Sequence, residues 1–305
     1  MNHGKVKKTL VVLSGPTGVG KTNLSVRLAQ YFQTEIISSD SRQIYSELSI
    51  GTAVPPPSDL EKVRHHLIHS HSVWDYYSAS HFEADALGIL DKLFSAKDIV
   101  FMTGGSMLYI DAVCRGMDDL PDANHELRAA LIREFEEHGL EHLRLRVKQL
   151  DPEYYAVADL KNPKRLLHAL EISLSTGKPY SSLLTAPKKE RAFRILKIGL
   201  NLERGELYER INRRVDQMME EGLEEEARRV YPLRHLNSLN TVGYKELFDF
   251  FDGKISKEEA VSLIRRNSRH YAKRQLTWFR RDQEINWFHP SQEEEIIRLI
   301  ENFLK

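Results

Sequence analysis

Cysteine is nearly absent from this sequence: Cys114 is the only one in 305 residues. A single cysteine excludes an internal disulfide framework and a multi-cysteine zinc site, and it fits a reducing compartment. Long apolar runs are also missing, because stretches such as Leu10–Leu13 are far shorter than the ~20 residues that cross a bilayer. We therefore expect no membrane association, and we expect Cys114 to be a small buried residue.

An excess of charge of either sign is lacking as well. The 44 Lys and Arg residues balance 44 Asp and Glu residues, which argues against a general nucleic-acid coat but leaves local basic patches possible. No secretory apolar segment follows the basic N-terminus, so we expect a cytoplasmic protein. With 41% hydrophobic and 29% charged residues, the composition is that of a globular protein and excludes disordered and low-complexity classes.

Short apolar runs alternate with helical patterns along most of the chain. The predicted strands are Thr9–Ser14, Thr34–Ser38, Asp98–Thr103, Leu196–Leu202 and Ile285–Phe288. This alternation predicts an α/β fold, a parallel sheet with helices on both faces. Between the third and fourth strands only helical periods occur, at Asn124–His138, Leu140–Leu150 and Pro163–Thr176. We predict a core domain of residues 1–120 and 194–305 and an all-helical insertion domain of residues 121–193.

A phosphate-binding motif follows the first predicted strand. The residues fit the pattern G-x-x-x-x-G-K-[ST] and are Gly15, Pro16, Thr17, Gly18, Val19, Gly20, Lys21 and Thr22. In a P-loop the glycines let backbone N–H groups face a polyphosphate, and the following helix adds its positive end. Lys21 supplies a cation, and the Thr22 hydroxyl is a candidate Mg²⁺ ligand. The alternative is a glycine-rich turn of chance spacing.

The carboxylate expected of an ATPase is missing from its usual place. The third strand ends at Thr103 and two glycines, not at Asp. An acid appears instead after the second strand, as Asp40, at the same sheet edge as the P-loop. Asp40 could accept a proton from an acceptor substrate, while Arg42 and Gln43 could contact a base or a phosphate. The alternative is that Asp40 and Ser41 only cap a helix or turn.

Six motifs together resemble one enzyme family. They are GPTGVGKT, DSRQIY, GGSMLY (104–109), NPKRLLHALE (162–171), TVGYKE (241–246) and AKRQLTWFRR (272–281). Their order is that of bacterial tRNA dimethylallyltransferases, also called tRNA isopentenyltransferases. The resemblance implies a P-loop kinase-like core with a helical insertion, use of Mg²⁺ without ATP hydrolysis, and a monomer. The implied reaction transfers a dimethylallyl group from dimethylallyl diphosphate to N6 of the adenine 3′ of the anticodon, in tRNAs that read codons beginning with U.

The same resemblance implies roles for individual residues. Thr17–Thr22 would hold the diphosphate, Arg214 with Arg210 would clamp it, and Asp40 would be the base, so that Asp40, Thr17 and Arg214 are the expected catalytic residues. The expected tRNA contacts are Asp40, Ser41, Arg42, Gln43, Ser106, Arg128, Lys164, Arg165, Leu166, Leu167, His168, Asn240, Thr241, Val242, Gly243, Tyr244 and Lys245.

A basic helix is predicted near the C-terminus. Residues 265–281 contain seven Lys and Arg residues and no Asp or Glu. At ~100° per residue, the basic residues from Arg266 to Arg281 share one arc, opposite Tyr271 and Trp278. We expect a ridge along tRNA phosphates that includes Arg269 and Lys273. The alternative is a solvated surface helix.

Two other functions remain possible from the residues alone. The first is a P-loop kinase that transfers the γ-phosphate of ATP to a small acceptor, and the second is a non-catalytic RNA-binding module. The histidines at 65, 66, 69 and 71 are expected to pack or cap a loop, because no cysteine or paired helical His–Glu pattern completes a metal site. The acidic run of Glu220, Glu221 and Glu224–Glu226 is expected to be a solvated helix face.

Overall fold

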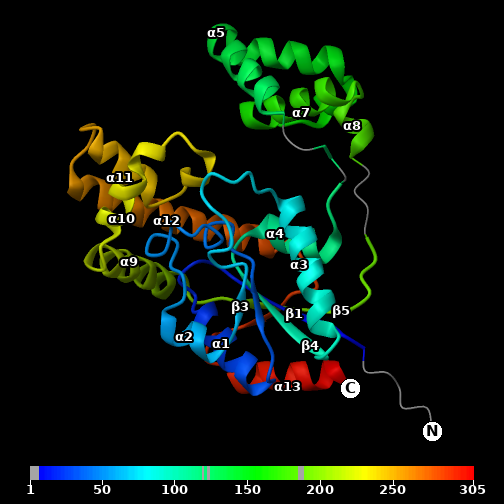
Figure 1. Ribbon diagram of the computed structural model, residues 1–305, viewed down its shortest axis with the longest axis vertical. Coiled ribbons are helices and arrows are strands. Elements are labelled where there is room, and N and C mark those ends of the chain that lie inside the picture. Colours follow the sequence, from blue (N-terminus) through cyan, green and yellow to red (C-terminus); the bar gives the residue numbers. More distant parts are fainter. Residues whose placement is uncertain (1–6, 119, 122–123, 185–188) are drawn as a thin grey trace. The chain divides into compact units, whose positions relative to one another are not determined.

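The computed structural model describes residues 7–118, 120–121, 124–184 and 189–305. The chain divides into two compact units (Figure 1). The sheet unit comprises Met1–Cys114 and Glu190–Lys305, and the helical unit comprises Arg115–Lys189. The predicted insertion, residues 121–193, begins and ends a few residues later than this unit, and its residues 122–123 and 185–188 lie outside the described part of the chain.

Six strands form one parallel sheet in the described part of the sheet unit. Its order is β3-β2-β4-β1-β5-β6. The strands are β1 (Thr9–Ser14), β2 (Ile36–Ser38), β3 (His65–His66), β4 (Ile99–Gly104), β5 (Arg194–Leu200) and β6 (Asn286–Phe288). The predicted α/β class is confirmed, and β3 is a strand that the sequence pattern did not predict. The carboxyl ends of β1, β2 and β4 share one edge, where the P-loop and Asp40 follow their strands.

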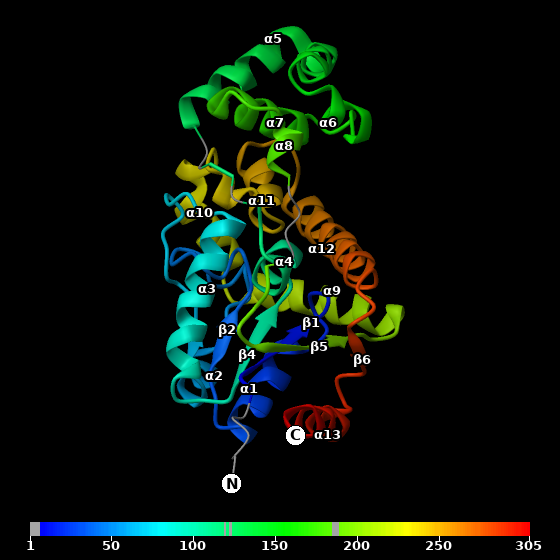
Figure 2. The ribbon, with the colours of Figure 1, turned by 90° about the vertical axis from the view of Figure 1, so that its right-hand side faces the viewer.

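Both faces of the sheet are buried (Figure 2). Val11 and Leu13 pack in one cluster with residues of α1 (Lys21–Tyr31) and α13 (Glu293–Leu304). The alternate residues of β1, Leu10 and Val12, are no more than 1% exposed. Since successive strand side chains point to opposite faces, a second layer must cover the other face. This arrangement explains why the strand reads as a continuous apolar run.

The remaining helices of the sheet unit come before β4 or after β5 in the chain, and α4 alone among them comes between these two strands. They are α2 (Pro57–Lys62), α3 (Ala79–Phe94), α4 (Met107–Arg115), α9 (Arg204–Glu220), α10 (Leu223–Val230), α11 (Tyr244–Phe251) and α12 (Lys257–Phe279), with 3₁₀ turns η1 (Tyr231–Leu233) and η2 (Asn237–Leu239). Helices α9 to α12 share a hydrophobic cluster that includes Val215, Leu223, Leu247 and Ile264. This cluster fixes α9 and α12 beside each other, and both helices contribute to the site described below.

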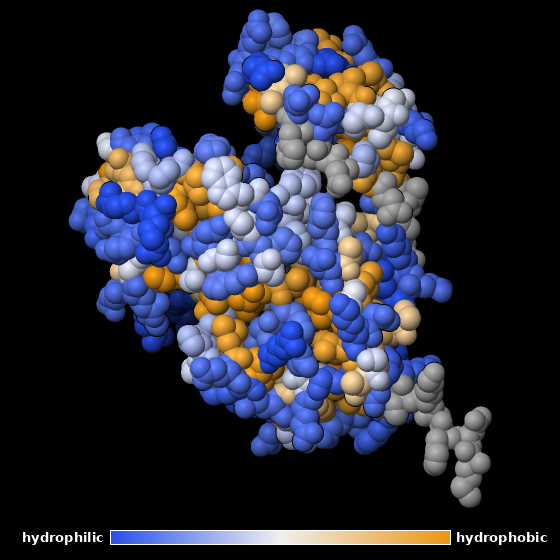
Figure 3. Space-filling model, viewed as in Figure 1, coloured by the Kyte–Doolittle hydropathy of each residue, from blue (hydrophilic) through white to orange (hydrophobic). Residues whose placement is uncertain are grey.

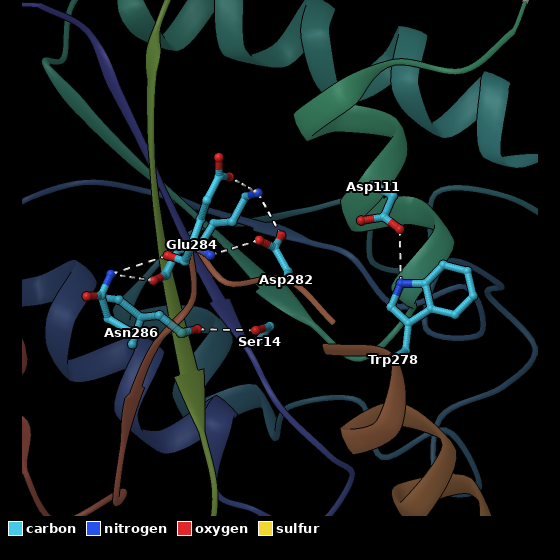
Figure 4. A network of polar contacts seen from close by, with 8 residues as sticks. Ser14, Asp111, Trp278, Asp282, Glu284 and Asn286 are labelled. Carbon is cyan, nitrogen blue, oxygen red and sulfur yellow. Dashed lines mark hydrogen bonds and ion pairs between the residues drawn. The ribbon is translucent and has the colours of Figure 1, made fainter. Parts of the chain in front are cut away.

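The C-terminal end of α12 is fastened by polar contacts (Figure 4). Trp278 Nε1 donates a hydrogen bond of 2.9 Å to Asp111 on α4. After the helix, Asp282 and Glu284 pair with Lys197 of β5 at 2.8 and 2.6 Å. Lys197 is only 7% exposed, so its charge requires these partners. Trp278 therefore anchors the helix, and the position of α12 against the sheet is set at both α4 and β5.

The helical unit consists of α5 (His125–Leu150), α6 (Pro152–Val157), α7 (Pro163–Thr176) and α8 (Tyr180–Leu183). Gly139 interrupts α5 with non-helical φ and ψ, at the division between the two helical segments that the sequence predicts. The side chains of Asn124 and Asn162 cap α5 and α7 by accepting backbone N–H groups at 3.0 and 3.3 Å.

The core of the helical unit is small, and apolar side chains remain on its surface. The buried cluster comprises Leu131, Leu143, Val147, Leu166, Leu167 and Leu170. Val157 is 81% and Leu145 53% exposed. Figure 3 shows hydrophobic side chains among hydrophilic ones on this unit. A unit of this size has little interior for its surface. In the described part of the chain, no helix has both the length and the apolar character needed to cross a bilayer.

Candidate active site

The predicted P-loop connects β1 to α1 at the carboxyl edge of the sheet. Gly18 and Gly20 have φ values of 81° and 100°, a left-handed conformation that residues with a Cβ rarely adopt. Lys21 begins α1, and its Nζ donates to the carbonyl oxygens of Gly15 and Pro16 at 2.9 Å each. The motif therefore adopts the strand–loop–helix form that phosphate binding requires, and the chance-turn alternative does not account for this placement.

Two half-buried cations, Lys21 and Arg214, lie close to this loop. Burial, with the positive charge of Arg214, lowers the pKa of Lys21 to about 7, while the carboxylate of Asp40 acts in the opposite direction. Burial also lowers the pKa of Arg214, again against the effect of Asp40. A desolvated cation whose pKa is lowered by a second positive charge is stabilised by an anion. The electrostatics of this site therefore favour a multiply charged anion such as a diphosphate.

Helix α9 brings arginines to the P-loop. Arg214 Nη1 donates to Thr17 Oγ1 at 3.4 Å. Arg210 lies one turn earlier, lines the same cavity and forms an ion pair of 3.0 Å with Glu206. Arg213, which no sequence motif singled out, also lines this cavity. The structure thus places Thr17 beside Arg214.

Asp40 follows β2 and uses one of its two oxygens within the protein. Its Oδ1 accepts the backbone N–H groups of Arg42 at 2.9 Å and Gln43 at 3.4 Å. This is the turn-capping arrangement that the sequence analysis considered as the alternative. In the described part of the chain, Oδ2 has no hydrogen-bond partner among the protein contacts. The turn orients the carboxylate and leaves one oxygen for a substrate.

Two cavities meet at this carboxylate. The first, of ≈ 690 Å³, is lined by the P-loop residues Thr17, Gly18, Gly20, Lys21 and Thr22, and the second has a volume of ≈ 420 Å³. The residues that line both are Thr17, Asp40, Thr52, Arg214 and Tyr271. The second cavity is also lined by apolar residues of α9 and α12, among them Ile211, Val215 and Ile264. The arrangement can hold an anionic group on one side of Asp40 and a second substrate on the other.

The loop after Asp40 is held by contacts that the sequence did not reveal. Ser41 and Arg42 line the second cavity, and Arg42 donates to the carbonyl of Ser238 at 2.8 Å. The amide of Gln43 donates to the carbonyls of Thr52 and Ala53, and its oxygen accepts from Ser38. Gln43 therefore supports the loop rather than presenting a free amide to a base.

Ser106 also supports this loop from within the protein. It is 7% exposed, and its Oγ accepts the N–H of Ser41 at 2.8 Å. Ser106 thus fixes the backbone of Ser41, which itself lines the second cavity. A direct contact of Ser106 with tRNA stays a prediction.

The TVGYKE segment forms one wall of the second cavity. Asn240, Thr241, Val242, Gly243 and Lys245 line it. Tyr244 does not, because its side chain is fully buried and its hydroxyl donates to Glu226 at 2.6 Å. The expected tRNA contact of the Tyr244 side chain is wrong for this reason.

Glu226 is a buried anchor for a second loop. It is 2% exposed and accepts the backbone N–H groups of Ser49, Ile50 and Gly51 at 2.9, 3.0 and 2.9 Å. The expectation that Glu224–Glu226 is a solvated face is therefore wrong for Glu226. Burial and the Glu226 carboxylate together raise the pKa of Tyr244, which keeps its hydroxyl protonated as a donor.

The expected tRNA contacts in the helical unit fall into two groups. Lys164 and Arg165 are exposed in the first turn of α7. Leu166 and Leu167 are 0% and 7% exposed and pack in the core of the unit, so their side chains cannot contact RNA. This correction follows from the helical period, which places Lys164 and Arg165 on the outward face of α7 and Leu166 and Leu167 on its inward face.

Arg128 and His168 are held by neighbours within the helical unit. Arg128 pairs at 2.7 Å with Glu171, a carboxylate that is 1% exposed. His168 is half-buried, and burial lowers its pKa.

Helix α12 presents two chemically different faces. Ile264, Ser268, Tyr271 and Gln275 line the cavities, and at ~100° per residue they share an arc of roughly 60°. The opposite side carries the exposed residues Arg266, His270, Lys273 and Arg280. Arg269 is half-buried and donates to Asn212 at 2.6 Å, and Arg274 lines the second cavity. The exposed basic surface of α12 therefore includes fewer residues than the ridge that the sequence predicts.

The histidine-rich segment has structural contacts. His66 lies on β3 and pairs with Glu35 at 2.8 Å, while His65 Nδ1 contacts the carbonyl of Val63. Among the described residues, no group of three or more His, Cys, Asp or Glu side chains could hold a metal ion. Cys114 is buried, as expected.

Comparison with known proteins gives the family. A family model described as IPP transferase matches residues 43–282. The chain belongs to the IPP transferase family. The tRNA dimethylallyltransferase 1 of Bacteroides fragilis is 56% identical to this chain over 298 residues. These residues are 98% of this chain and 99% of that protein. The tRNA dimethylallyltransferase of Christiangramia forsetii is 52% identical over 279 residues, 92% of each chain.

Solved structures of IPP transferases have the same fold. The full-length tRNA isopentenylpyrophosphate transferase of Bacillus halodurans is 37% identical to this chain and gives a TM-score of 0.71. The match covers 98% of this chain and 97% of that protein. A eukaryotic dimethylallyltransferase, described as acting on tRNA, is 26% identical over 89% of this chain and 69% of its own, with a TM-score of 0.73. These findings confirm the resemblance drawn from the six motifs and give no support to the kinase alternative.

Proposed function

We propose that this IPP transferase transfers a dimethylallyl group from dimethylallyl diphosphate to N6 of the adenine 3′ of the anticodon, in tRNAs that read codons beginning with U. The products would be N6-isopentenyladenosine and diphosphate. Family membership supports this proposal, and so does one geometric observation. The cavity that contains the P-loop meets a second cavity at Asp40, Thr17 and Arg214.

The first cavity suits the leaving diphosphate. As the bond between C1 of the allyl group and the diphosphate oxygen breaks, negative charge grows on that oxygen. Lys21, Arg214 and the Thr17 hydroxyl lie where they can stabilise this charge. Because both cations are half-buried, their attraction to the leaving group is screened less by water than at a fully exposed surface.

The second cavity suits the acceptor adenine. N6 is inaccessible in a stacked anticodon loop, so the base must be extruded to react. With the base in this cavity, Oδ2 of Asp40 would accept a hydrogen bond from the amine. Asp40 would then take the N6 proton as the new bond between N6 and C1 forms, and the diphosphate would depart with the electron pair of the broken bond.

The first cavity also fits Mg²⁺. Magnesium often takes one or two protein oxygens and completes its coordination with substrate phosphates and water. Thr22 lines the cavity beside Lys21, so its hydroxyl faces the space that the phosphates would occupy. When bound through the Thr22 hydroxyl, Mg²⁺ would neutralise charge on the diphosphate.

We further propose that the protein acts in the cytoplasm as a monomer. The described residues that line the two cavities all belong to the sheet unit. Exposed basic residues, among them Lys164, Arg165 and Lys273, would contact the tRNA backbone.

The test is incubation of the protein with labelled dimethylallyl diphosphate, Mg²⁺ and unmodified tRNA. We expect label to enter tRNA with the wild-type protein and not with Asp40→Ala. Transfer of phosphate from labelled ATP to a small acceptor would favour the kinase instead. Binding of tRNA without any transfer would favour the RNA-binding module, and either result would overturn the proposal.

A further inference from the structure

Gln275 is a buried polar residue in the middle of the cavity-facing side of α12. Its side chain is 1% exposed, and it lines the cavity that contains the P-loop. An uncharged amide at such a position must satisfy its hydrogen bonds within the protein. The pattern of basic residues around it in the sequence gave no indication of this role.

The side chain of Gln275 connects two other segments of the site. Its Oε1 accepts the backbone N–H of Thr17 at 2.8 Å, and its Nε2 donates to the carbonyl of Gly105 at 2.9 Å. A Cβ at residue 105 would collide with this amide, so the glycine leaves room for it. One amide thus ties α12 to the P-loop and to the segment after β4.

The bond to Thr17 has a direct bearing on the site. Thr17 lines both cavities, and its hydroxyl accepts from Arg214. Gln275 holds the backbone N–H of Thr17 in place. Because the Thr17 side chain is attached to this backbone, the position of its hydroxyl depends on Gln275. A small displacement of such a group is costly in catalysis, since reacting groups must be held close to their productive geometry.

We propose that Gln275 is a positioning residue for the transfer step, which it serves by fixing Thr17 between Arg214 and the diphosphate. This inference rests on the proposed function. It acts through the Thr17 peptide and requires no contact between Gln275 and the reacting atoms.

The main test compares kcat and KM in Gln275→Leu, in the otherwise intact protein. We expect kcat to fall on the order of 100-fold and KM for tRNA to stay within about twofold, because the exposed basic face of α12 is unchanged. Gln283→Leu, at an exposed position after the same helix, is the matched control and should retain wild-type kinetics. A wild-type kcat in Gln275→Leu would overturn the proposal.

A second variant removes the hydroxyl on which Gln275 acts. Thr17→Ala keeps the backbone N–H that Gln275 accepts. If Gln275 acts through Thr17, the double variant Thr17→Ala with Gln275→Leu should lose little more activity than Thr17→Ala alone. Losses that multiply would show a general structural role and would contradict the proposal.

Gln275→Glu separates the two hydrogen bonds. The carboxylate can still accept from Thr17, but it repels the carbonyl of Gly105 until it is protonated. The kcat of this variant relative to wild type should therefore recover as pH falls from 8 to 6, and a flat ratio would count against the proposal. This variant also serves if Gln275→Leu fails to fold.

A binding measurement distinguishes failure of this inference from failure of the proposed function. If the wild-type protein transfers no label to tRNA, the proposed function is wrong. Calorimetry with inorganic pyrophosphate still tests Gln275 in that case, and Gln275→Leu should bind about tenfold more weakly than wild type. Equal affinities would overturn the role of Gln275, whatever reaction the site performs.

Discussion

The hydroxyl of Tyr244 donates a hydrogen bond to the Glu226 carboxylate at 2.6 Å, in a region where both side chains are almost completely excluded from solvent. The same carboxylate holds the loop of Ser49, Ile50 and Gly51. This pair joins two segments that border the second cavity, since Gly51 and Gly243 both line it. The TVGYKE motif therefore has a structural component as well as a surface that lines the second cavity.

Replacing Tyr244 with Phe should destabilise the protein by about 1–3 kcal/mol, because a buried carboxylate loses a donor. Urea unfolding would measure the change. Tyr31→Phe is a matched control, since Tyr31 makes a similar bond of 2.8 Å to Glu301 at the surface, and we expect no measurable change there. Equal effects in the two variants would contradict the argument from burial.

Binding of the diphosphate should weaken as pH rises above 7. Burial lowers the pKa of Lys21 to about 7, so the free protein loses this proton above that pH. A bound diphosphate favours the charged amine, and binding must then take up a proton. The dissociation constant of dimethylallyl diphosphate should rise by up to about tenfold per pH unit. Lys21→Met should bind weakly with a much smaller dependence on pH between 7 and 9, and an equal slope would assign the proton to another group.

Replacing Arg214 with Gln should lower kcat by about 100-fold or more, since removal of one preorganised donor to a developing charge costs on the order of 3 kcal/mol. In this variant, binding of dimethylallyl diphosphate should begin to weaken at a higher pH than in the wild-type protein. The reason is that the charge of Arg214 contributes to the low pKa of Lys21. Arg204→Gln, exposed at the start of α9, is the control. An unchanged kcat in Arg214→Gln would remove it from the catalytic residues.

Replacing Lys273 with Gln should weaken tRNA binding and reduce the slope of log K against log salt by nearly one, as expected when one phosphate contact is lost. Arg269→Gln should reduce the slope less, because Arg269 is half-buried and already donates to Asn212. Filter binding at several salt concentrations measures both slopes. Lys257→Gln is the control, since Lys257 pairs with Glu224 at 2.7 Å. An unchanged slope in Lys273→Gln would exclude it from the tRNA interface.

The parts of the site that the sequence predicted depend on local patterns. The run Thr9–Ser14 and the glycines after it specify a strand and a P-loop within fourteen residues, counted from 9 to 22, and both lie where expected. Asp40 was recognised because its position after a strand follows from the same alternation. In contrast, β3 consists of two histidines, and a strand of that length has no periodicity to detect.

The residues that the sequence did not reveal are those defined by distant partners. Glu226 appeared as one acid in an acidic run, and its burial depends on a loop about 175 positions away. Gln275 and Thr17 are 258 positions apart, and neither position alone indicates the contact. Tyr271 was placed only on the side of the helix opposite the basic residues, although it lines both cavities. Only the folded chain brings these groups together.

The two-sided character of α12 has a consequence for how this enzyme can vary. A helix is nearly rigid over a few turns, so Lys273 and Gln275 cannot move independently of each other. Insertion or loss of one residue between them would rotate one face by ~100° relative to the other. Lys273 would then no longer lie on the exposed side while Gln275 reaches Thr17. We therefore expect this stretch to tolerate exchanges of side chain but not changes of length.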